Sequence, residues 1–342
     1  MDTLATRRIG STALHTTVIG FGSAPLGNRY RVLTEQHCIT LVDDAWERGV
    51  RLFDTAPMYG HGLAENRLGT ALRGRPRADY LLATKVGRLL RPASQVPQDS
   101  MWTSLPPMRI EYDYSSDGTL RSIDDSLQRM LTDRIDIVFI HDCDRYGHGV
   151  NQPTVFDDAM TGAARALFEL RDQGVLGAVG IGVNEADVCV AAADRGDFDA
   201  FLLAGRYTLL EQDALDDLLP LCAQRSISLI LGGVFNSGIL ASGAREGAHH
   251  NYAPAGSDVV ARVQRIEAVC NRYRVPLAAV ALQFCLAHPA VASALVGTST
   301  VEQQAANMAA AQTHVPGELW VELRELNLVR PDAPVADARG PG

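Results

Sequence analysis

LFDTAPMYG (residues 52–60), LLATKVG (residues 81–87) and IVFIHD (residues 137–142) are three apolar runs that each lead into polar side chains. Their length and their β-branched and aromatic content are typical of β-strands. Longer stretches with helical spacing separate them, and the same alternation continues along most of the chain. Strand-then-helix units repeated in this way favour a parallel sheet covered by helices.

Eight such units indicate a (β/α)8 TIM barrel, an α/β fold with long loops at the C-terminal mouth of the strands. The predicted strands cover residues 18–20, 50–54, 80–84, 137–141, 178–183, 200–204, 228–231 and 293–296. The predicted helices cover residues 35–48, 64–72, 120–131, 155–172, 185–195, 213–224, 259–273 and 301–311. Because no linker divides the chain, we expect one domain over residues 1–342.

Three segments depart from this repeat. Residues 7–17 precede the first strand, and we expect them to form a hairpin under the barrel. Residues 88–118 are expected to form a long loop that overhangs the pocket, since a loop of this length in a compact domain is usually functional. Residues 330–342 are rich in Pro, Ala and Gly and are expected to be mobile.

The composition favours a small molecule as the partner. The formal net charge of −9 argues against nucleic acid or an anionic membrane surface. No apolar run reaches about 18 residues, so we expect no membrane span, and residues 1–20 lack the pattern of a secretory signal. The six cysteines have no CxxC spacing and are expected to be reduced thiols of a cytoplasmic protein. Nothing in the sequence indicates an oligomeric state.

Four polar residues fall at or just past the ends of the three quoted runs: Asp54, Tyr59, Lys85 and His141. In a parallel barrel these ends meet over one pocket, so we expect the four side chains to lie together. A free tyrosine is a poor acid or base at neutral pH, but a nearby ammonium lowers its pKa. We expect Lys85 to lower the pKa of Tyr59, and Asp54 to hold Lys85. His141 is expected to hydrogen-bond the substrate oxygen. Such a group can move a proton on an alcohol oxygen while hydride is transferred at the adjacent carbon.

Several stretches of the chain resemble the aldo-keto reductase family. They are FDTAPMYGHGLAENRLGTAL (53–72), ATKVG (83–87), DIVFIHD (136–142), GIGVN (180–184) and LVGTSTVEQQAANM (295–308). The resemblance runs from about residue 17 to about residue 328. It implies a (β/α)8 barrel, a nicotinamide cofactor over the C-terminal mouth, and a catalytic tetrad made of Asp54, Tyr59, Lys85 and His141. Tyr59 would be the proton donor or acceptor.

The same resemblance implies a cofactor site. Asn184 matches the position that binds the nicotinamide carboxamide, and residues 232–240 (GGVFNSGIL) match a loop around the pyrophosphate. Glycines there let backbone N–H groups approach closely. The expected cofactor-binding residues are Asn184, Gly232, Gly233, Asn236, Ser237, Gly238, Gly297, Thr298, Ser299, Gln303 and Asn307. Two departures stand out: Ala204 replaces a glutamine, and an aromatic residue common near Gly232 is missing.

Residues 297–307 (GTSTVEQQAAN) favour NAD over NADP. Family members that use the 2′-phosphorylated cofactor often carry Lys or Arg in this segment to pair with the phosphate. Gly297 and Gln303 stand where those cations would be expected, and Glu302 adds negative charge. A phosphate dianion would therefore find little compensation.

Within the family, several stretches resemble the branch of aldose 1-dehydrogenases that act on L-fucose and L-galactose, together with pyridoxal 4-dehydrogenase. They are residues 53–65, 123–130, 133–144, 202–212 and 232–241. This resemblance implies NAD-dependent oxidation of the hemiacetal hydroxyl of an aldose to the lactone, or of pyridoxal to 4-pyridoxolactone. A sugar or a pyridoxal-like substrate needs hydrogen-bond partners and a stacking face. The candidates are Trp102, Asp113, Tyr114, Asp144, Arg145 and His148.

Two other functions stay open at this point. One is a broad NADPH-dependent aldehyde reductase, against which the missing cations argue. The other is a non-catalytic barrel that binds cofactor and regulates a partner, against which the intact tetrad argues. Residues 141–144 (HDCD), His148, His249 and His250 match no ordinary ligand spacing, so no metal site is expected.

Overall fold

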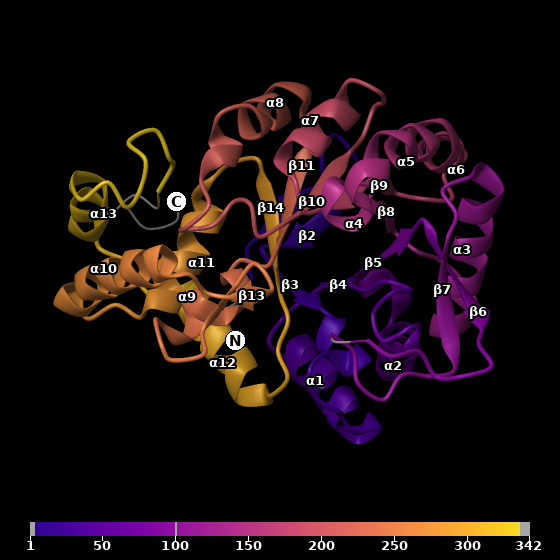
Figure 1. The fold of residues 1–342 in the computed structure, drawn as a ribbon, viewed down its shortest axis with the longest axis horizontal. Coiled ribbons are helices and arrows are strands. Elements are labelled where there is room, and N and C mark those ends of the chain that lie inside the picture. The colour runs from indigo at the N-terminus through magenta and orange to yellow at the C-terminus, as the bar shows by residue number, and fades with distance from the viewer. Residues whose placement is uncertain (1–3, 100, 336–342) are drawn as a thin grey trace.

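Eight parallel strands close into a barrel in the computed structural model, which describes residues 4–99 and 101–335 (Figure 1). Around the barrel the order is β3–β4–β5–β8–β9–β10–β11–β14, and β14 pairs with β3. The strands are β3 (Ile19–Gly22), β4 (Leu52–Asp54), β5 (Leu81–Val86), β8 (Ile137–His141), β9 (Ala178–Val183), β10 (Ala200–Ala204), β11 (Ser228–Gly232) and β14 (Val291–Val296). The predicted α/β barrel is confirmed, and every predicted barrel strand appears with small shifts at its ends.

Alternation along the strands separates two buried layers. On β8, Ile137 and Phe139 belong to the cluster that fills the barrel interior. Val138 and Ile140 belong to the larger cluster between the strands and the helices. Because successive side chains of a strand point to opposite faces, the next inward position on β8 is His141.

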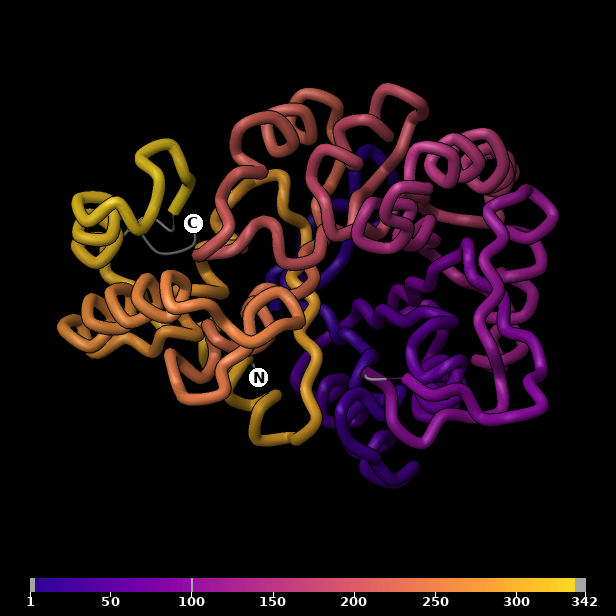
Figure 2. The backbone as a smooth tube through the Cα atoms, in the orientation of Figure 1, coloured from indigo at the N-terminus to yellow at the C-terminus, as the bar shows by residue number. Residues whose placement is uncertain are grey.

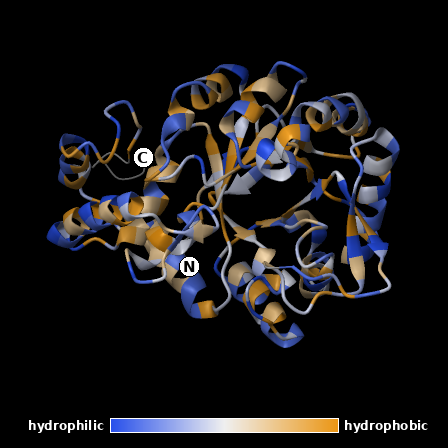
Figure 3. Cartoon of the chain, in the orientation of Figure 1, coloured by the Kyte–Doolittle hydropathy of each residue, from blue (hydrophilic) through white to orange (hydrophobic). Residues whose placement is uncertain are grey.

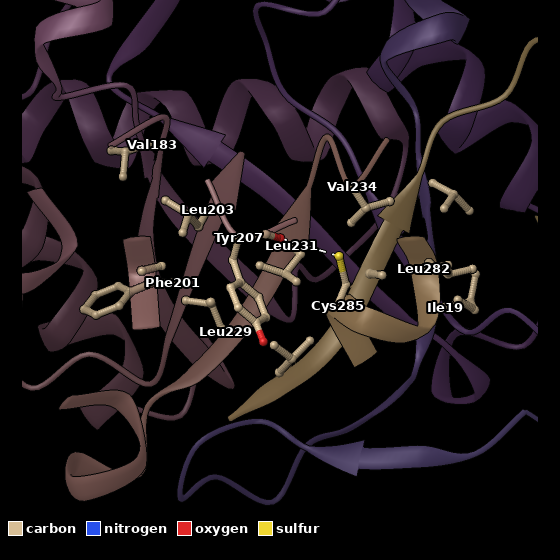
Figure 4. Packing of buried hydrophobic residues seen from close by; sticks show 14 of the residues in the cluster. Ile19, Val183, Phe201, Leu203, Tyr207, Leu229, Leu231, Val234, Leu282 and Cys285 are labelled. Carbon is tan, nitrogen blue, oxygen red and sulfur yellow. Dashed lines mark hydrogen bonds between the residues drawn. The ribbon is translucent and has the colours of Figure 1, made fainter. Parts of the chain in front are cut away.

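The outer layer is packed by apolar side chains of strands and helices. Figure 4 shows part of it, with Phe201, Leu229 and Tyr207 in the same layer, and Cys285 donates to the backbone carbonyl of Tyr207 at 3.5 Å. Cys285 belongs to α11 (Leu277–Ala287), a helix absent from the predicted elements. Its sequence LAAVALQFCLA is apolar on nearly every side and therefore has no polar stripe to mark a helical period.

Helices surround the barrel, with hydrophilic residues on their outer faces and apolar strands at the centre (Figure 3). They are α1 (Glu35–Glu47), α2 (Leu63–Leu72), α3 (Ser116–Met130), α4 (Arg145–His148), α5 (Gln152–Asp158), α6 (Ala164–Asp172), α7 (Ala186–Ala193), α8 (Leu218–Arg225), α9 (Ile239–Ser242), α10 (Ser257–Tyr273), α11, α12 (Val301–Gln312) and α13 (Gly317–Glu325). The predicted helix over 155–172 is interrupted by a π-helical turn, Ala159–Ala163. The predicted helix over 213–224 begins at Leu218, after a separate short turn over Asp213–Leu215.

The expected hairpin before the first barrel strand is present. Strands β1 (Thr6–Arg8) and β2 (His15–Thr17) pair antiparallel. Ile9, at the turn between them, is fully buried in the interior cluster of the barrel. Arg7 donates to the backbone carbonyl of Leu286 at 2.8 Å, which ties the hairpin to the end of α11. The hairpin therefore closes the end of the barrel opposite the mouth.

The segment expected to be a long loop over residues 88–118 contains regular structure, which corrects that expectation. Strands β6 (Arg88–Pro92) and β7 (Met108–Tyr112) form an antiparallel hairpin, and α3 begins at Ser116. Figure 2 shows the connection between the two strands running back toward the indigo segment at the start of the chain. Backbone hydrogen bonds dock it there, from Tyr30 N to Met101 O at 3.0 Å and from Thr103 N to Asn28 O at 3.1 Å. Long-range backbone pairing of this kind leaves no local pattern in the sequence.

The start of the tail expected to be mobile is packed against the domain. Arg330 pairs with Asp216 at 2.7 Å, and Ala333 is buried. Residues 336–342 of this predicted mobile tail lie outside the described residues. Within residues 4–99 and 101–335, no helix has the length and apolar character needed to cross a membrane.

Candidate active site

The alternation of the strands places three of the four predicted catalytic side chains inside the barrel mouth. Leu52 and Ala83 belong to the interior cluster, and Asp54 and Lys85 follow them at the next inward positions of β4 and β5. His141 is the equivalent position of β8, the neighbour of β5. Tyr59 comes from the loop between β4 and α2. The structure thus brings the four predicted residues together.

A buried ion pair forms the base of this group. The Lys85 Nζ atom donates to both carboxylate oxygens of Asp54, at 2.9 and 2.8 Å, and to the backbone carbonyl of Thr55 at 2.8 Å. Both side chains are almost fully buried. Burial opposes the charge of Lys85, but Asp54 and the phenol of Tyr59 outweigh it and raise the pKa of Lys85. Lys85 therefore stays protonated.

Tyr59 lies over this ion pair, with the Lys85 ammonium 4.7 Å from the centre of its ring. Burial raises the pKa of the Tyr59 phenol, and the Lys85 ammonium offsets only part of that rise. The expectation of a net lowering of this pKa is therefore wrong for the protein as described, because desolvation of the phenolate outweighs the cation. A protonated phenol beside an ammonium is set up to donate its proton to a carbonyl oxygen.

His141 faces Tyr59, with ring centres 6.0 Å apart and the rings nearly perpendicular. Burial, followed by the charges of Arg88 and Lys85, lowers the pKa of His141 well below its usual value of about 6.5. The imidazole is therefore neutral over the physiological pH range. A neutral imidazole can donate one hydrogen bond to a substrate oxygen without transferring a proton.

Arg88 is a residue of the site that was not among the predicted ones. It is only 4% exposed, it donates to His141 Nδ1 at 2.7 Å, and it pairs with Asp142 at 2.8 Å. The one signal in the sequence is its position three residues after Lys85, at the start of the segment predicted to overhang the pocket. A charged residue there must either leave the barrel or find a buried partner.

Asn184 and Asp144 lie next to this arginine pair. Asn184 donates through its side-chain amide to Asp142 and Asp144, both at 3.2 Å, and its backbone N–H donates to Asp144 at 2.6 Å. The other oxygen of Asp144 accepts from the backbone of Gly147 at the start of α4. Asp144 was predicted to contact substrate, but it is fully buried with both oxygens engaged, so it instead positions Asn184.

Trp102 is the predicted substrate residue that does reach the catalytic group. Its ring centre lies 5.8 Å from that of Tyr59, and it is 3% exposed. The connection between β6 and β7 carries it there and pairs with Arg29. Its indole N–H has no hydrogen-bond partner among the described residues. Trp102 therefore lies beside the catalytic group, and its contact with a ring-shaped substrate stays a prediction.

The other predicted substrate residues lie elsewhere. Asp113, Tyr114 and His148 line a separate cavity of about 580 Å³ between β7, α3 and α5. The hydroxyl of Tyr114 donates to the backbone carbonyl of His141 at 2.7 Å, and Asp113 accepts from Ser115 ahead of α3. These placements correct the predicted contacts with substrate, because β7 turns the segment with Asp113 and Tyr114 outward and His148 lies at the end of α4.

Arg145, also predicted to contact substrate, pairs with two acidic residues on the rim. Its guanidinium lies 3.1 Å from Glu185 and 2.7 Å from Asp187. The side chain is half exposed, and its charge is compensated by these neighbours. It therefore stabilises the start of α7 rather than the pocket.

The opposite side of the mouth, where the cofactor loop was predicted, is built from small residues. Ala204 and Gly232 are directly paired at the ends of β10 and β11, and no aromatic side chain stands at either position. Gly233 has a φ of 61° and Gly238 a φ of 99°, a region that favours glycine. A Cβ atom at Gly238 would meet nothing within 4 Å. The chain therefore leaves open space here.

Two polar residues of the predicted cofactor loop are engaged within the loop itself. Asn236 is buried, donates to the carbonyl of Gly205 at 3.2 Å and accepts from Thr208 at 2.5 Å. The hydroxyl of Ser237 accepts from the backbone N–H of Tyr252 at 2.9 Å. The Asn236 side chain thus stabilises the loop, and the backbone groups of the loop stay available to a ligand.

The remaining predicted cofactor residues follow β14. Gly297 is exposed, Thr298 is buried, Ser299 and Gln303 are joined by a hydrogen bond of 3.0 Å from Ser299 N, and Asn307 lies partly buried on α12. Thr300 caps α12 by accepting from Gln303 N at 3.2 Å. The segment therefore presents the positive end of a helix toward the mouth.

Two basic side chains reach this segment from far along the chain. Arg31 donates to the backbone carbonyl of Ser299 at 2.6 Å, and His37 Nε2 lies 2.8 Å from the same oxygen. No cation is close to Gln303 along the sequence, as expected, but the fold brings Arg31 to the same segment. Sequence reasoning had no means to find these residues, because they lie more than 260 positions away.

The residues at the mouth fit a nicotinamide cofactor. None of the hydrogen bonds among the described residues ends on the Oδ1 atom of Asn184, so that oxygen can accept from a carboxamide. The glycines at the end of β11 admit a backbone-bound pyrophosphate, and the start of α12 can receive the adenosine end. No group of three His, Cys, Asp or Glu among the described residues is placed to hold a metal ion.

Comparison with known proteins decides the family. Residues 18–328 match the model of the Aldo/keto reductase family. The chain belongs to this family. Its similar curated relatives include pyridoxal 4-dehydrogenase of Microbacterium luteolum, 40% identical over 94% of this chain and 97% of that protein. D-threo-aldose 1-dehydrogenase of Pseudomonas sp is 37% identical over 91% of this chain and 94% of that protein.

A solved aldo-keto reductase structure from Bacillus halodurans, in its holo form, matches with a TM-score of 0.73 and 25% identity, covering 98% of this chain and 97% of that one. As an aldo-keto reductase with dehydrogenases among its relatives, the chain is an oxidoreductase acting on CH–OH or carbonyl groups. Members of this family bind nicotinamide cofactors, which agrees with the fit of the mouth. The alternative of a non-catalytic regulatory barrel loses its support.

One part of the family-like block is structural in this aldo-keto reductase. Glu65, in the segment AEN, is fully buried, accepts from Thr84 at 2.8 Å, and pairs with Arg129 at 2.6 Å. It ties α2 to β5 and α3, directly behind the strand that carries Lys85. The resemblance of residues 53–72 to the family therefore reflects packing as well as chemistry.

Proposed function

We propose that this aldo-keto reductase is an NAD-dependent dehydrogenase that oxidises the hydroxyl of a cyclic hemiacetal to a lactone. The observation that carries the proposal is the catalytic group itself: a phenol over a buried Lys85–Asp54 pair, opposite a neutral imidazole. That arrangement suits proton transfer on an oxygen whose carbon exchanges hydride.

Each side chain has a distinct part in the proposed step. In reduction the protonated phenol of Tyr59 donates its proton to the reacting oxygen. In oxidation Tyr59 first releases that proton to solvent and, as phenolate, accepts the proton of the reacting hydroxyl. Lys85 stabilises the phenolate form when Tyr59 has given up its proton. His141 donates a hydrogen bond to the same oxygen and fixes its position. The bound nicotinamide, when oxidised, accepts the hydride.

The substrate class is proposed from the relatives and from Trp102. An aldose in its ring form and pyridoxal both present a hemiacetal hydroxyl. The relative named for pyridoxal is 40% identical, and the relative named for D-threo-aldose is 37% identical. Trp102, next to Tyr59, supplies a face against which a ring can pack. An aldose such as L-fucose or L-galactose is the first candidate, and pyridoxal is the second.

NAD is proposed as the cofactor because Glu302 and Gln303 stand at the start of α12, where a 2′-phosphate would need cations. Arg31 instead favours NADP, since its guanidinium reaches Ser299. Six buried, unpaired cysteines support a reducing compartment such as the cytoplasm.

The test is a substrate panel. The full chain is incubated with NAD or NADP and with L-fucose, L-galactose, D-arabinose or pyridoxal, and with NADH or NADPH and a simple aldehyde, and the absorbance of the reduced cofactor is followed. The proposal predicts NAD reduction with a sugar or with pyridoxal, and formation of the lactone. Turnover of simple aldehydes with NADPH alone would instead make the protein a broad aldehyde reductase.

A further inference from the structure

The charge of Arg88 explains its pair with Asp142 but not its contact with the imidazole of His141. A guanidinium has donors and no acceptor, and it stays protonated at all relevant pH values. The nitrogen of His141 that faces it, Nδ1 at 2.7 Å, must therefore supply a lone pair. In a neutral imidazole the proton then resides on Nε2.

The Nε2 atom of His141 has no comparable partner. Its nearest carboxylate oxygen, Asp142 Oδ2, is 3.5 Å away, beyond a normal N–H···O distance. That same oxygen already accepts from Arg88 at 2.8 Å. Nε2–H is thus left for a ligand in the barrel mouth.

The backbone holds Arg88 in this position. Gly87, just before it, has a φ of 98°, and a Cβ there would lie 2.3 Å from the ring of Tyr114. Only glycine fits, and its left-handed turn directs β6 so that Arg88 reaches back under the mouth. The Tyr114 hydroxyl fixes the backbone of His141 from the same side, at 2.7 Å.

A continuous chain of hydrogen bonds joins this pair to the cofactor side. Asp144 binds the amide of Asn184, Asn184 donates to Asp142, Asp142 accepts from Arg88, and Arg88 donates to His141. Every link lies between 2.7 and 3.2 Å. The series thus links the Asn184 amide, which is expected to bind nicotinamide, to the His141 imidazole, which is expected to bind substrate.

We propose that Arg88 is a positioning residue that fixes His141 as its neutral Nε2–H tautomer and aims this N–H at the substrate oxygen. Its catalytic consequence rests on the proposed function, but the tautomer does not. The charged and titratable groups around His141 are Lys85 and Tyr59 from the tetrad, Asp142, Tyr114 and Arg88 itself. Lys85 and Arg88 both oppose its protonation.

The direct test is ¹⁵N NMR of the full chain labelled at histidine, with and without NAD, from pH 5.5 to 8.5. A His141→Gln variant identifies the signal among the nine histidines. The wild type is expected to show the Nε2–H tautomer and no titration over this range. An Nδ1–H pattern, or titration near pH 6.5, would overturn the proposal without any assay of activity.

Substitution at Arg88 gives the second test. Arg88→Met is expected to produce a mixture of tautomers, a titrating His141, and a fall in kcat of about 100-fold with a smaller change in the KM for NAD. Arg88→Lys, which keeps a charge and a donor, should recover part of the loss. Arg91→Gln is the matched control, since Arg91 lies on the same strand and pairs with Glu111 near the surface.

If Arg88→Met does not fold, the double variant Arg88→Met/Asp142→Asn also removes the carboxylate that the first substitution leaves unpaired, and the same spectra are recorded on it. Unchanged tautomer and titration in a folded variant would show that Arg88 does not set the state of His141. A wild-type Nε2–H tautomer together with no turnover on the substrate panel would refute the proposed function alone.

Discussion

The two sides of the barrel mouth are built on different principles. On the side of β4, β5 and β8, charged side chains are buried and every one has a partner, as in the bidentate contact between Lys85 and Asp54. On the side of β10, β11 and β14, small residues such as Ala204 and Gly232 end the strands, and loops with positive φ angles follow. The first side fixes reacting groups in one geometry, and the second leaves room for a large ligand.

This difference teaches where precision is needed. Proton transfer demands atoms held within a fraction of an ångström, which strands and paired charges provide. A cofactor is bound over many contacts, so backbone groups and helix ends in loops suffice. Substitutions on the first side should therefore have large effects on the rate or on stability, and those on the second should have modest effects on binding.

The largest effect is expected for Tyr59→Phe, which removes the proton carrier and keeps the ring. We expect kcat to fall by about 1,000-fold or more, while the affinity for NAD, measured by fluorescence titration, changes little. Retention of more than about a tenth of the wild-type rate would contradict the role of Tyr59. It would also remove the contrast between the two sides.

Lys85→Met tests the buried ion pair. It leaves Asp54 charged and unpaired in the interior, so we expect a loss of about 3–5 kcal/mol in the free energy of unfolding, measured with urea. Adding Asp54→Asn should restore part of that loss while activity stays low. Arg165→Met, in an exposed pair with Glu169, is the control and should cost at most about 1 kcal/mol. Equal losses from both single variants would argue against this account.

The lowered pKa of His141 predicts a pH dependence of stability. Below pH of about 6.5 the unfolded state binds a proton at this histidine and the folded state does not, so stability falls as the pH falls. In His141→Gln this slope, measured between pH 5 and 6.5, should be smaller by up to about 1.4 kcal/mol per pH unit. An unchanged slope would mean that His141 takes up a proton in the folded protein over the same pH range as in the unfolded chain.

The smallest effect is expected on the open side. If NAD is the cofactor, Arg31→Gln should change the Kd for NAD by less than about 3-fold, because Arg31 then contacts only the backbone of Ser299. A loss of 10-fold or more for NADP, with NADP bound better than NAD by the wild type, would reverse the cofactor assignment. Isothermal titration with both cofactors distinguishes the two outcomes.

The sequence predicted the barrel and the tetrad because both depend on local, periodic patterns. Asp54, Lys85 and His141 stand at or just past the ends of apolar runs that predict strands, and the alternation of side chains carries these residues into the mouth. The predicted substrate residues fared less well. Asp144 is buried under Asn184. Asp113 and Tyr114 line another cavity because the β6–β7 hairpin turns their segment outward, and His148, at the end of α4, lines the same cavity.

What the sequence by itself determined is which residues end each strand, since a period of two and a run of apolar residues are properties of neighbouring positions. Only the tertiary structure decided which distant residues meet those ends. Arg88 reaches His141 across 53 positions and Arg31 reaches Ser299 across 268, each through a turn and a packing arrangement that local spacing does not encode. The physical reason is that charged side chains, buried or exposed, bind whatever partner the closed barrel brings near, and closure is a property of the whole chain.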